Sequence, residues 1–114
     1  MKIFLICPVR NADAKHSRAA MVYVKSLESR SHEIHWPPRD TDQSAKGIDI
    51  CRQNMEAIKS ADEVHIFYDG TSQGVHFDMG MAFALGKKIV VVGNESYDEG
   101  KSFQRMLDEW SQNV

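Results

Sequence analysis

Residues 64–86 read VHIFYDGTSQGVHFDMGMAFALG, and this stretch decides the fold of the chain. Residues 64–68 have the length and the β-branched and aromatic content of a buried strand. Residues 77–85 are too rich in Met, Ala and Leu for a second strand, so they predict a mostly buried helix that ends at Gly86. The polar loop between them leads from the carboxyl end of a strand to the amino end of a helix. Because open α/β folds bind ligands at such loops, we expect the functional site here.

The rest of the chain continues this alternation of strand and helix. Apolar patterns predict strands at residues 2–7, 32–36, 63–68 and 88–92, and further helices at about residues 13–30, 48–60 and 102–112. This order predicts a single α/β domain over residues 1–114, with a flavodoxin-like or Rossmann-like parallel sheet of four to five strands and helices on both faces. Residues 37–47 are polar and show no apolar period, so they form either a mobile linker or a functional loop.

Length and composition exclude several classes of function. The chain has 114 residues, 42% of them hydrophobic and 26% charged, and a net charge of −2, which argues against nucleic acid as a partner. The apolar runs fall well short of the roughly 20 residues that span a bilayer, and residues 1–10 lack a signal-peptide pattern. We therefore expect no membrane partner and a cytoplasmic location. Cys7 and Cys51 lack metal-ligand spacing, so we expect two reduced thiols and no metal.

Several polar residues should meet at one edge of the predicted sheet. Since the carboxyl ends of parallel strands open on the same edge, Arg10, Arg39, Asp40 and residues 72–78 are expected around one crevice. Ser72 and Gly74 precede a helix whose free N–H groups and dipole suit a phosphate or carboxylate, and Arg10 could bind the same anion. The alternative is that Ser72 only caps the helix and that Arg10 is solvated.

Asp78 is the sharpest candidate for chemistry. It lies about one turn into a helix with apolar neighbours, where an acid is costly unless it is exposed, paired or useful. The helix dipole favours its ionised form, as a carboxylate nucleophile requires, although an acid in the first turn can also serve only to complement the dipole. His65 and His76 are plausible bases by type, but a lone histidine is more often a packed or surface residue.

These residues also resemble a known family. Residues 50–92 are similar to the signature half of the nucleoside 2-deoxyribosyltransferase family, which includes deoxyribonucleoside 5′-monophosphate N-glycosidases. The matching motifs are Ala61-Asp62, Ser72-Gln73-Gly74, Asp78-Met79-Gly80 and the segment from Ala82 to Lys87 and Lys88. The loop Cys7-Pro8-Val9-Arg10 also resembles the phosphate-side loop of the monophosphate hydrolases in that family.

The resemblance implies a mechanism and a set of site residues. A carboxylate at Asp78 would attack the anomeric carbon of a nucleoside or its 5′-monophosphate and displace the base, and Asn54 would be the second catalytic position, facing the sugar or base. The chemistry needs no cofactor, and the family implies a homo-oligomer, a dimer or higher. The substrate or its phosphate is expected to bind at Pro8, Val9, Arg10, Asn11, Ser72, Gly74, Arg39 and Asp40.

Two hypotheses stay open. The family normally carries glutamate at the position of Asp78 and an acid at that of Asn54, so the alternative to an enzyme is a nucleotide-binding or sensing module on the same fold. An Asp78→Asn variant would discriminate between them. Other uses of the fold fit worse. A low-molecular-weight phosphatase needs an arginine at the sixth position after the cysteine that follows the first strand, and the sixth residue after Cys7 is Asp13. The sequence also shows no P-loop, no receiver-domain acidic pair and no dinucleotide-binding glycine pattern.

Overall fold

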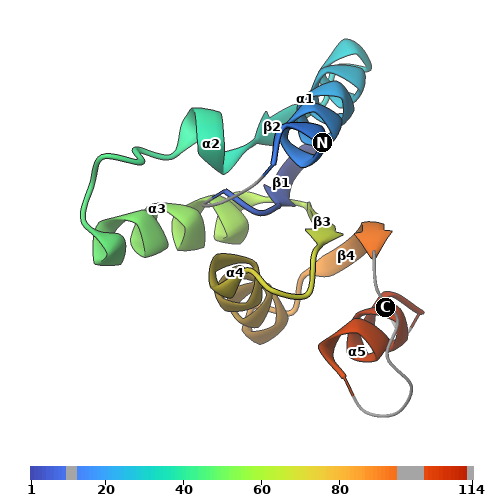
Figure 1. Ribbon diagram of the computed structural model, residues 1–114. Coiled ribbons are helices and arrows are strands. Elements are labelled where there is room, and N and C mark those ends of the chain that lie inside the picture. Colours follow the sequence, from blue (N-terminus) through green and yellow to red (C-terminus); the bar gives the residue numbers. More distant parts are fainter. Residues whose placement is uncertain (10–12, 95–101, 113–114) are drawn as a thin grey trace.

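The computed structural model describes residues 1–9, 13–94 and 102–112. Its strands form one parallel sheet in the order β2-β1-β3-β4, which confirms the flavodoxin-like prediction (Figure 1). The strands are β1 (Lys2–Ile6), β2 (Glu33–His35), β3 (Glu63–Tyr68) and β4 (Lys88–Asn94). The predicted bounds hold for β3, whereas β4 extends past its predicted end at residue 92 after a register shift opposite Ile66 and Phe67.

Helices connect and cover these strands. They are α1 (Ala14–Ser29), α2 (Pro37–Asp40), α3 (Gly47–Ser60), α4 (Gln73–Ala84) and α5 (Phe103–Gln112). The short helix α2 was not predicted; it forms because Pro37 and Pro38 occupy its first positions, where a fixed φ and a missing N–H are tolerated. No helix within the described ranges has the length and apolar content that crossing a membrane requires.

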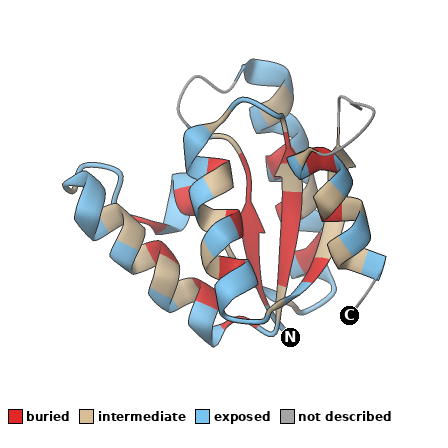
Figure 2. Ribbon diagram, turned by 90° about the horizontal axis from the view of Figure 1, so that it is seen from below, coloured by how far each residue is buried: buried red, intermediate tan, exposed pale blue. Residues whose placement is uncertain are grey.

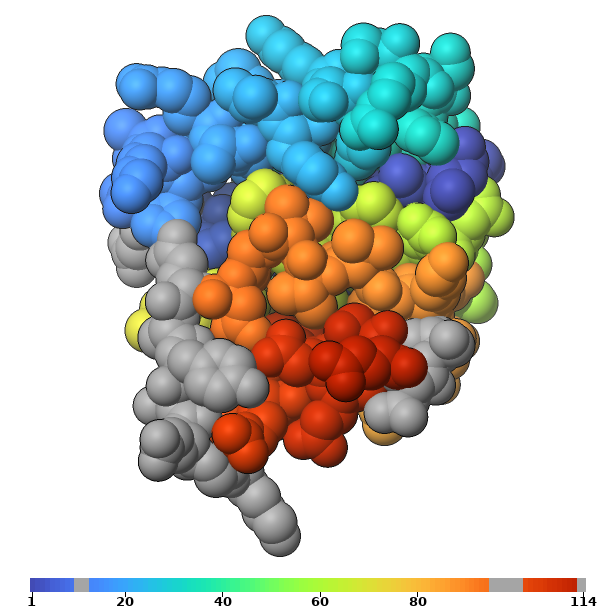
Figure 3. All heavy atoms as spheres, turned by 90° about the vertical axis from the view of Figure 1, so that its right-hand side faces the viewer, coloured from blue at the N-terminus to red at the C-terminus, as the bar shows by residue number. Residues whose placement is uncertain are grey.

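The helices lie on both faces of the sheet, as expected. On one face α1 packs Ala20, Val24 and Leu27 against strand residues that include Leu5 and Ile34. On the other face, α3, α4 and α5 contribute side chains such as Ile58, Met79 and Leu107 to the larger core cluster. Figure 3 shows α1 and α5 on opposite sides of β4, and Figure 2 shows the buried strands between the helices.

Local signals fix both ends of α4. The Ser72 side chain caps its amino end by accepting a hydrogen bond from the Val75 N–H at 3.3 Å. At the other end Gly86 has a φ of 66°, and the N–H groups of Gly86 and Lys87 bond back to Phe83 and Ala82. The predicted end of this helix at Gly86 is therefore confirmed, and Asp78 lies near its middle.

The strand order places a topological switch point beside β1. The connection through α1 leads to β2 on one side of β1, and the connection through α3 leads to β3 on the other side. The chain segments that leave β1 and β3 therefore diverge at the carboxyl edge of the sheet, where α/β proteins of this topology bind ligands.

Candidate functional site

Asp78 is a half-buried carboxyl on α4 with an unusual protonation equilibrium. Burial raises its pKa from 3.8 to about 7, and a hydrogen bond from the Asn54 side chain acts in the opposite direction. The helix dipole led us to expect an ionised group, but the loss of water outweighs the dipole here. Near neutral pH the group therefore exists in both charged and protonated forms, which is a property of catalytic carboxyls more than of structural ones.

Cys7 follows the carboxyl end of β1 and interacts electrostatically with Asp78. Burial raises the pKa of its thiol to about 12; the Trp36 side chain opposes this shift, and the negative charge of Asp78 adds to it. The thiol therefore stays protonated and is not a nucleophile. Both cysteines are free, and Cys7 is buried, as expected from the sequence.

Trp36 is a site residue that the sequence did not single out. It follows β2, its ring lies near Cys7, and its Nε1 is a buried donor without a well-formed hydrogen bond in the described part of the chain. Such donors are rare in folded proteins and often await water or a ligand. Its position directly before two prolines at the end of a strand was the available signal.

Asn54 is held in place by its neighbours. It is buried on α3, and its Oδ1 accepts a hydrogen bond from the Thr41 hydroxyl at 2.7 Å. The structure thus brings together the two positions expected to be catalytic, Asp78 and Asn54, beside the end of β1. Their catalytic roles stay predictions.

The loop before α4 is organised by Asp69. Its carboxylate accepts hydrogen bonds from the N–H groups of Thr71 and Ser72 and from the Thr71 hydroxyl. Ser72 caps α4, as one of the two readings of the sequence expected, and Gly74 is exposed in the first turn of the helix. Binding of an anion by Ser72 and Gly74 stays a prediction.

The two histidines near the site are packed residues. His76 donates from Nδ1 to the Ser72 carbonyl at 2.8 Å, so its Nε2 accepts from the Tyr68 hydroxyl at 2.9 Å. His65 has its nitrogens 2.6 Å from the Tyr23 hydroxyl and 3.0 Å from the Glu63 carboxylate. Both ring nitrogens are engaged in each case, which favours the structural interpretation of these histidines.

Arg39 and Asp40 have partners of their own. The Arg39 guanidinium contacts Asp40 at 2.8 Å and Glu28 of α1 at 3.1 Å, and it donates to the Ile34 carbonyl. Asp40 also accepts from the Trp36 N–H. These contacts join α2 to α1 and β2, and a role for this pair in substrate binding stays a prediction.

The loop after β1 is only partly described. Pro8 is half-buried and Val9 is exposed at the carboxyl edge of the sheet, whereas Arg10 and Asn11 lie outside the described residues. Pro8, Phe67, Tyr68 and Asp69 line a small hollow at this edge. Within residues 1–9, 13–94 and 102–112, no three His, Cys, Asp or Glu side chains are placed to hold a metal ion.

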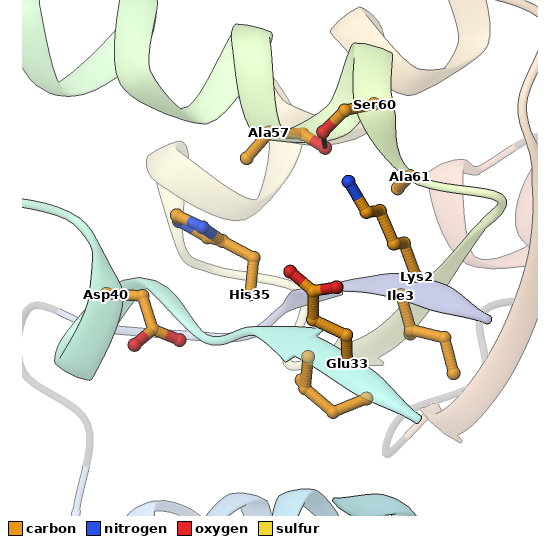
Figure 4. A pocket seen from close by; sticks show the side chains of 9 residues that line it. Lys2, Ile3, Glu33, His35, Asp40, Ala57, Ser60 and Ala61 are labelled. Atoms are coloured by element: carbon orange, nitrogen blue, oxygen red, sulfur yellow. Dashed lines mark hydrogen bonds between the residues drawn. The ribbon is translucent and has the colours of Figure 1, made fainter. Parts of the chain in front are cut away.

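A separate groove of about 270 Å³ runs between α3 and the strands β1 and β2. Figure 4 shows Lys2, Glu33 and His35 extending from the strands toward Ala57 and Ser60 on α3. Asp78 and Asn54 are not among its lining residues, so the groove is distinct from the site at the carboxyl edge.

Known proteins resemble this chain in sequence and fold. The family model described as nucleoside 2-deoxyribosyltransferase matches residues 3–108. A CMP N-glycosidase from Clostridium botulinum, BcmB, superposes with a TM-score of 0.65 at 24% identity, over 97% of this chain and 83% of that one. A 2-deoxyribosyltransferase from Bacillus psychrosaccharolyticus gives a TM-score of 0.68 at 17% identity, over 86% and 77%.

A conserved protein from Enterococcus faecalis V583 gives a TM-score of 0.69 at 20% identity, over 99% of this chain and 76% of that one. At these identities the three structures establish a shared fold. No curated protein sequence matches this chain.

Proposed function

Because the chain belongs to the nucleoside 2-deoxyribosyltransferase family, we propose that it breaks the N-glycosidic bond of a nucleoside or nucleoside 5′-monophosphate, by hydrolysis or by deoxyribosyl transfer. The observation that carries this proposal is the Asp78 carboxyl, half-buried beside the end of β1, hydrogen-bonded by Asn54 and raised in pKa to about 7. A carboxylate that is poorly solvated and more basic than usual is a stronger nucleophile than one in water.

The reaction proceeds in two displacements at the anomeric carbon. One Asp78 oxygen forms a bond to C1′ as the C1′–N bond breaks, and the base leaves with the electron pair and takes up a proton. Water then attacks C1′ and releases the free sugar, or a second base attacks and releases a new nucleoside. In either case the C1′–O bond to Asp78 breaks, the carboxylate is restored, and the attacking group gives up a proton to solvent. Asn54 would hold the reacting oxygen or the sugar beside it, and its influence on the pKa of Asp78 supports this role.

The amino end of α4 and the loop after β1 are the proposed binding site for the 5′-hydroxyl or 5′-phosphate. Support comes from the free N–H groups of the first turn at Gly74, next to the Ser72 cap. Pro8 and Val9 lead into residues 10–12, which include Arg10 and Asn11. Arg39 and Asp40 would approach the substrate only by exchanging some of their present partners.

A nucleotide-binding module without turnover is the second candidate. It is favoured by the short Asp78 side chain, which reaches one methylene less far than the glutamate usual in the family, and by Asn54 in place of an acid. A displacement of about 1 Å at a reacting group can lower the rate about a hundredfold.

The deciding experiment is a long incubation with ribo- and deoxyribonucleosides and their 5′-monophosphates, with free base measured by chromatography. Release that is lost in Asp78→Asn but kept in Asp49→Asn, which removes an exposed acid from α3, supports the enzyme. If no base is released while a compound from the same panel raises the melting temperature, the binding module is the correct function.

We also propose that the protein forms a homo-oligomer through the outer face of α4. Asp78 is the one charged residue of this helix, and the Phe77 and Phe83 side chains on it are 50% and 62% exposed. A helix that is apolar all round is normally covered. The single domain over residues 1–114 and the cytoplasmic location stay predictions.

Ala84→Lys places a charge on this face without removing a packed side chain. We expect it to lower the molar mass measured by light scattering, whereas Ser26→Lys, on the exposed surface of α1, should not. An unchanged mass in Ala84→Lys, or a monomeric parent protein, would contradict the interface.

A further inference from the structure

A chain of polar contacts leads from the end of β2 to Asp78. His35 Nε2 lies 2.8 Å from the Thr41 hydroxyl oxygen, which lies 2.7 Å from Asn54 Oδ1. The Asn54 side chain in turn is the hydrogen-bonding group that lowers the pKa of Asp78, against the larger effect of burial. Thr41 and Asn54 are only 4% and 6% exposed, so protein atoms rather than bulk water decide how these groups orient.

The contacts define one direction for the chain. The single Thr41 proton is donated to Asn54 Oδ1, so Thr41 accepts a hydrogen bond from the N–H at His35 Nε2. With Oδ1 engaged by Thr41, the Asn54 group left to interact with Asp78 is its NH₂. An ionised carboxylate can only accept, so this direction suits the charged form of Asp78, whereas the reverse would suit the protonated form.

His35 is itself fixed. Its ring stacks on Phe4, with centroids 5.3 Å apart and an angle of 9° between the planes, and another part of it lines the groove between α3 and the strands (Figure 4). Burial lowers the pKa of His35, with Asp40 raising it and Arg39 lowering it. The ring is therefore neutral near pH 7, and its proton resides on Nε2 because Thr41 accepts it.

We propose that Thr41 and His35 are positioning residues for the reaction: they lock the Asn54 amide so that its N–H groups face the Asp78 carboxylate. This rests on the proposed function for its catalytic consequence. It gives a task to residues 37–47, a segment whose sequence suggested either a linker or a functional loop. It also accounts for an asparagine at position 54, because a clamped amide supplies a donor without a proton to lose.

The test compares Thr41→Val, which removes the hydroxyl and keeps the shape, with Thr41→Ser, which keeps the hydroxyl. Ile89→Val, a core substitution distant from the chain of contacts in sequence, controls for lost stability. The Asp78 carboxyl is titrated by ¹³C NMR, and the pH profile of base release is measured with the nucleoside 5′-monophosphate that the wild type cleaves.

In Thr41→Val the Asp78 midpoint and the acid limb of kcat should both rise by about 0.5–1 pH unit, since one fixed hydrogen bond is weakened. We expect kcat at pH 6 to fall about three- to tenfold with little change in KM. Thr41→Ser and Ile89→Val should titrate like the wild type. A wild-type midpoint in Thr41→Val would overturn the proposal.

A second pair keeps the proposal testable if Thr41→Val does not fold. His35→Gln retains an N–H donor, whereas His35→Phe retains the stacking on Phe4 but not the donor, so only His35→Phe should shift the midpoint. Equal midpoints in these two variants would overturn the proposal. The Asp78 midpoint could shift in Thr41→Val or His35→Phe although the wild type releases no base. That result would refute the proposed function and the catalytic consequence, but it would still show that Thr41 and His35 fix the Asn54 amide.

Discussion

Two carboxyl groups beside the same sheet have opposite properties. Glu63, on the face covered by α1, is paired with His65 at 3.0 Å and Lys88 at 3.3 Å, and the hydrogen bond from His65, more than the pairing with Lys88, lowers its pKa. Asp78, on the other face, has no cation among its described partners; burial raises its pKa to about 7.

The difference shows which polar cluster is structural. Around Glu63, the His65 ring bridges the Glu63 carboxylate and the Tyr23 hydroxyl, so the polar groups of this cluster hydrogen-bond one another. Around Asp78, Thr41 donates to Asn54, Asn54 lowers the pKa of Asp78, and burial nevertheless raises that pKa to about 7. Strongly perturbed carboxyl groups cluster at functional sites, which is why the proposed chemistry is placed at Asp78.

We expect the largest difference between the two carboxyl groups in the catalytic activity of variants that lack one of them. Asp78→Asn should reduce base release about a thousandfold or more, because the nucleophile is lost. Glu63→Gln removes a charge of the same sign and should stay within about twofold of the parent protein. The measurement is kcat/KM for the nucleotide identified in the panel, and comparable losses in both variants would erase the distinction.

The pH dependence sharpens the comparison. Only ionised Asp78 can act as nucleophile, so kcat/KM should fall below about pH 7 by about tenfold per pH unit. Between pH 7, where half of Asp78 is ionised, and pH 5 the total loss should be about fiftyfold. A profile that stays flat down to pH 5 would mean that Asp78 titrates as an ordinary solvated carboxyl.

Stability should respond to pH with opposite sign at the two sites. The raised pKa of Asp78 means that the folded state loses stability as pH rises from about 4 through 7, when a buried charge forms. Asp78→Asn avoids this cost, so its stability relative to the parent should improve by about 2 kcal/mol between pH 5 and pH 8.

Glu63→Gln should behave in the other direction and by a smaller amount. The lowered pKa of Glu63 stabilises the fold above pH 4.5, and this contribution is lost as pH falls through the lower folded value. The variant should therefore lose about 1 kcal/mol at pH 7, reduced by solvent screening, and little at pH 3. Urea unfolding at each pH measures both variants, and parallel curves would contradict the opposite signs.

The sequence by itself determined the parallel sheet, the end of α4 at Gly86 and the choice of Asp78 as a candidate catalytic residue. Each is written in neighbouring residues: apolar runs with the period of buried strands, a glycine that adopts positive φ, and an acid within an apolar helix. The family resemblance rests on the order and spacing of short motifs, which are also local.

Only the tertiary structure decided the environment of Asp78. Cys7 and Asn54 both influence Asp78, and Thr41 hydrogen-bonds Asn54, although these residues are far apart in sequence. They interact only because the sheet topology brings β1, α3 and α4 together. Reasoning from the helix dipole alone gave the wrong direction for its pKa, since desolvation depends on what packs around the group. Likewise, the partners of Arg39 on α1 could not be read from its own segment, because ion pairs are set by distances across the fold.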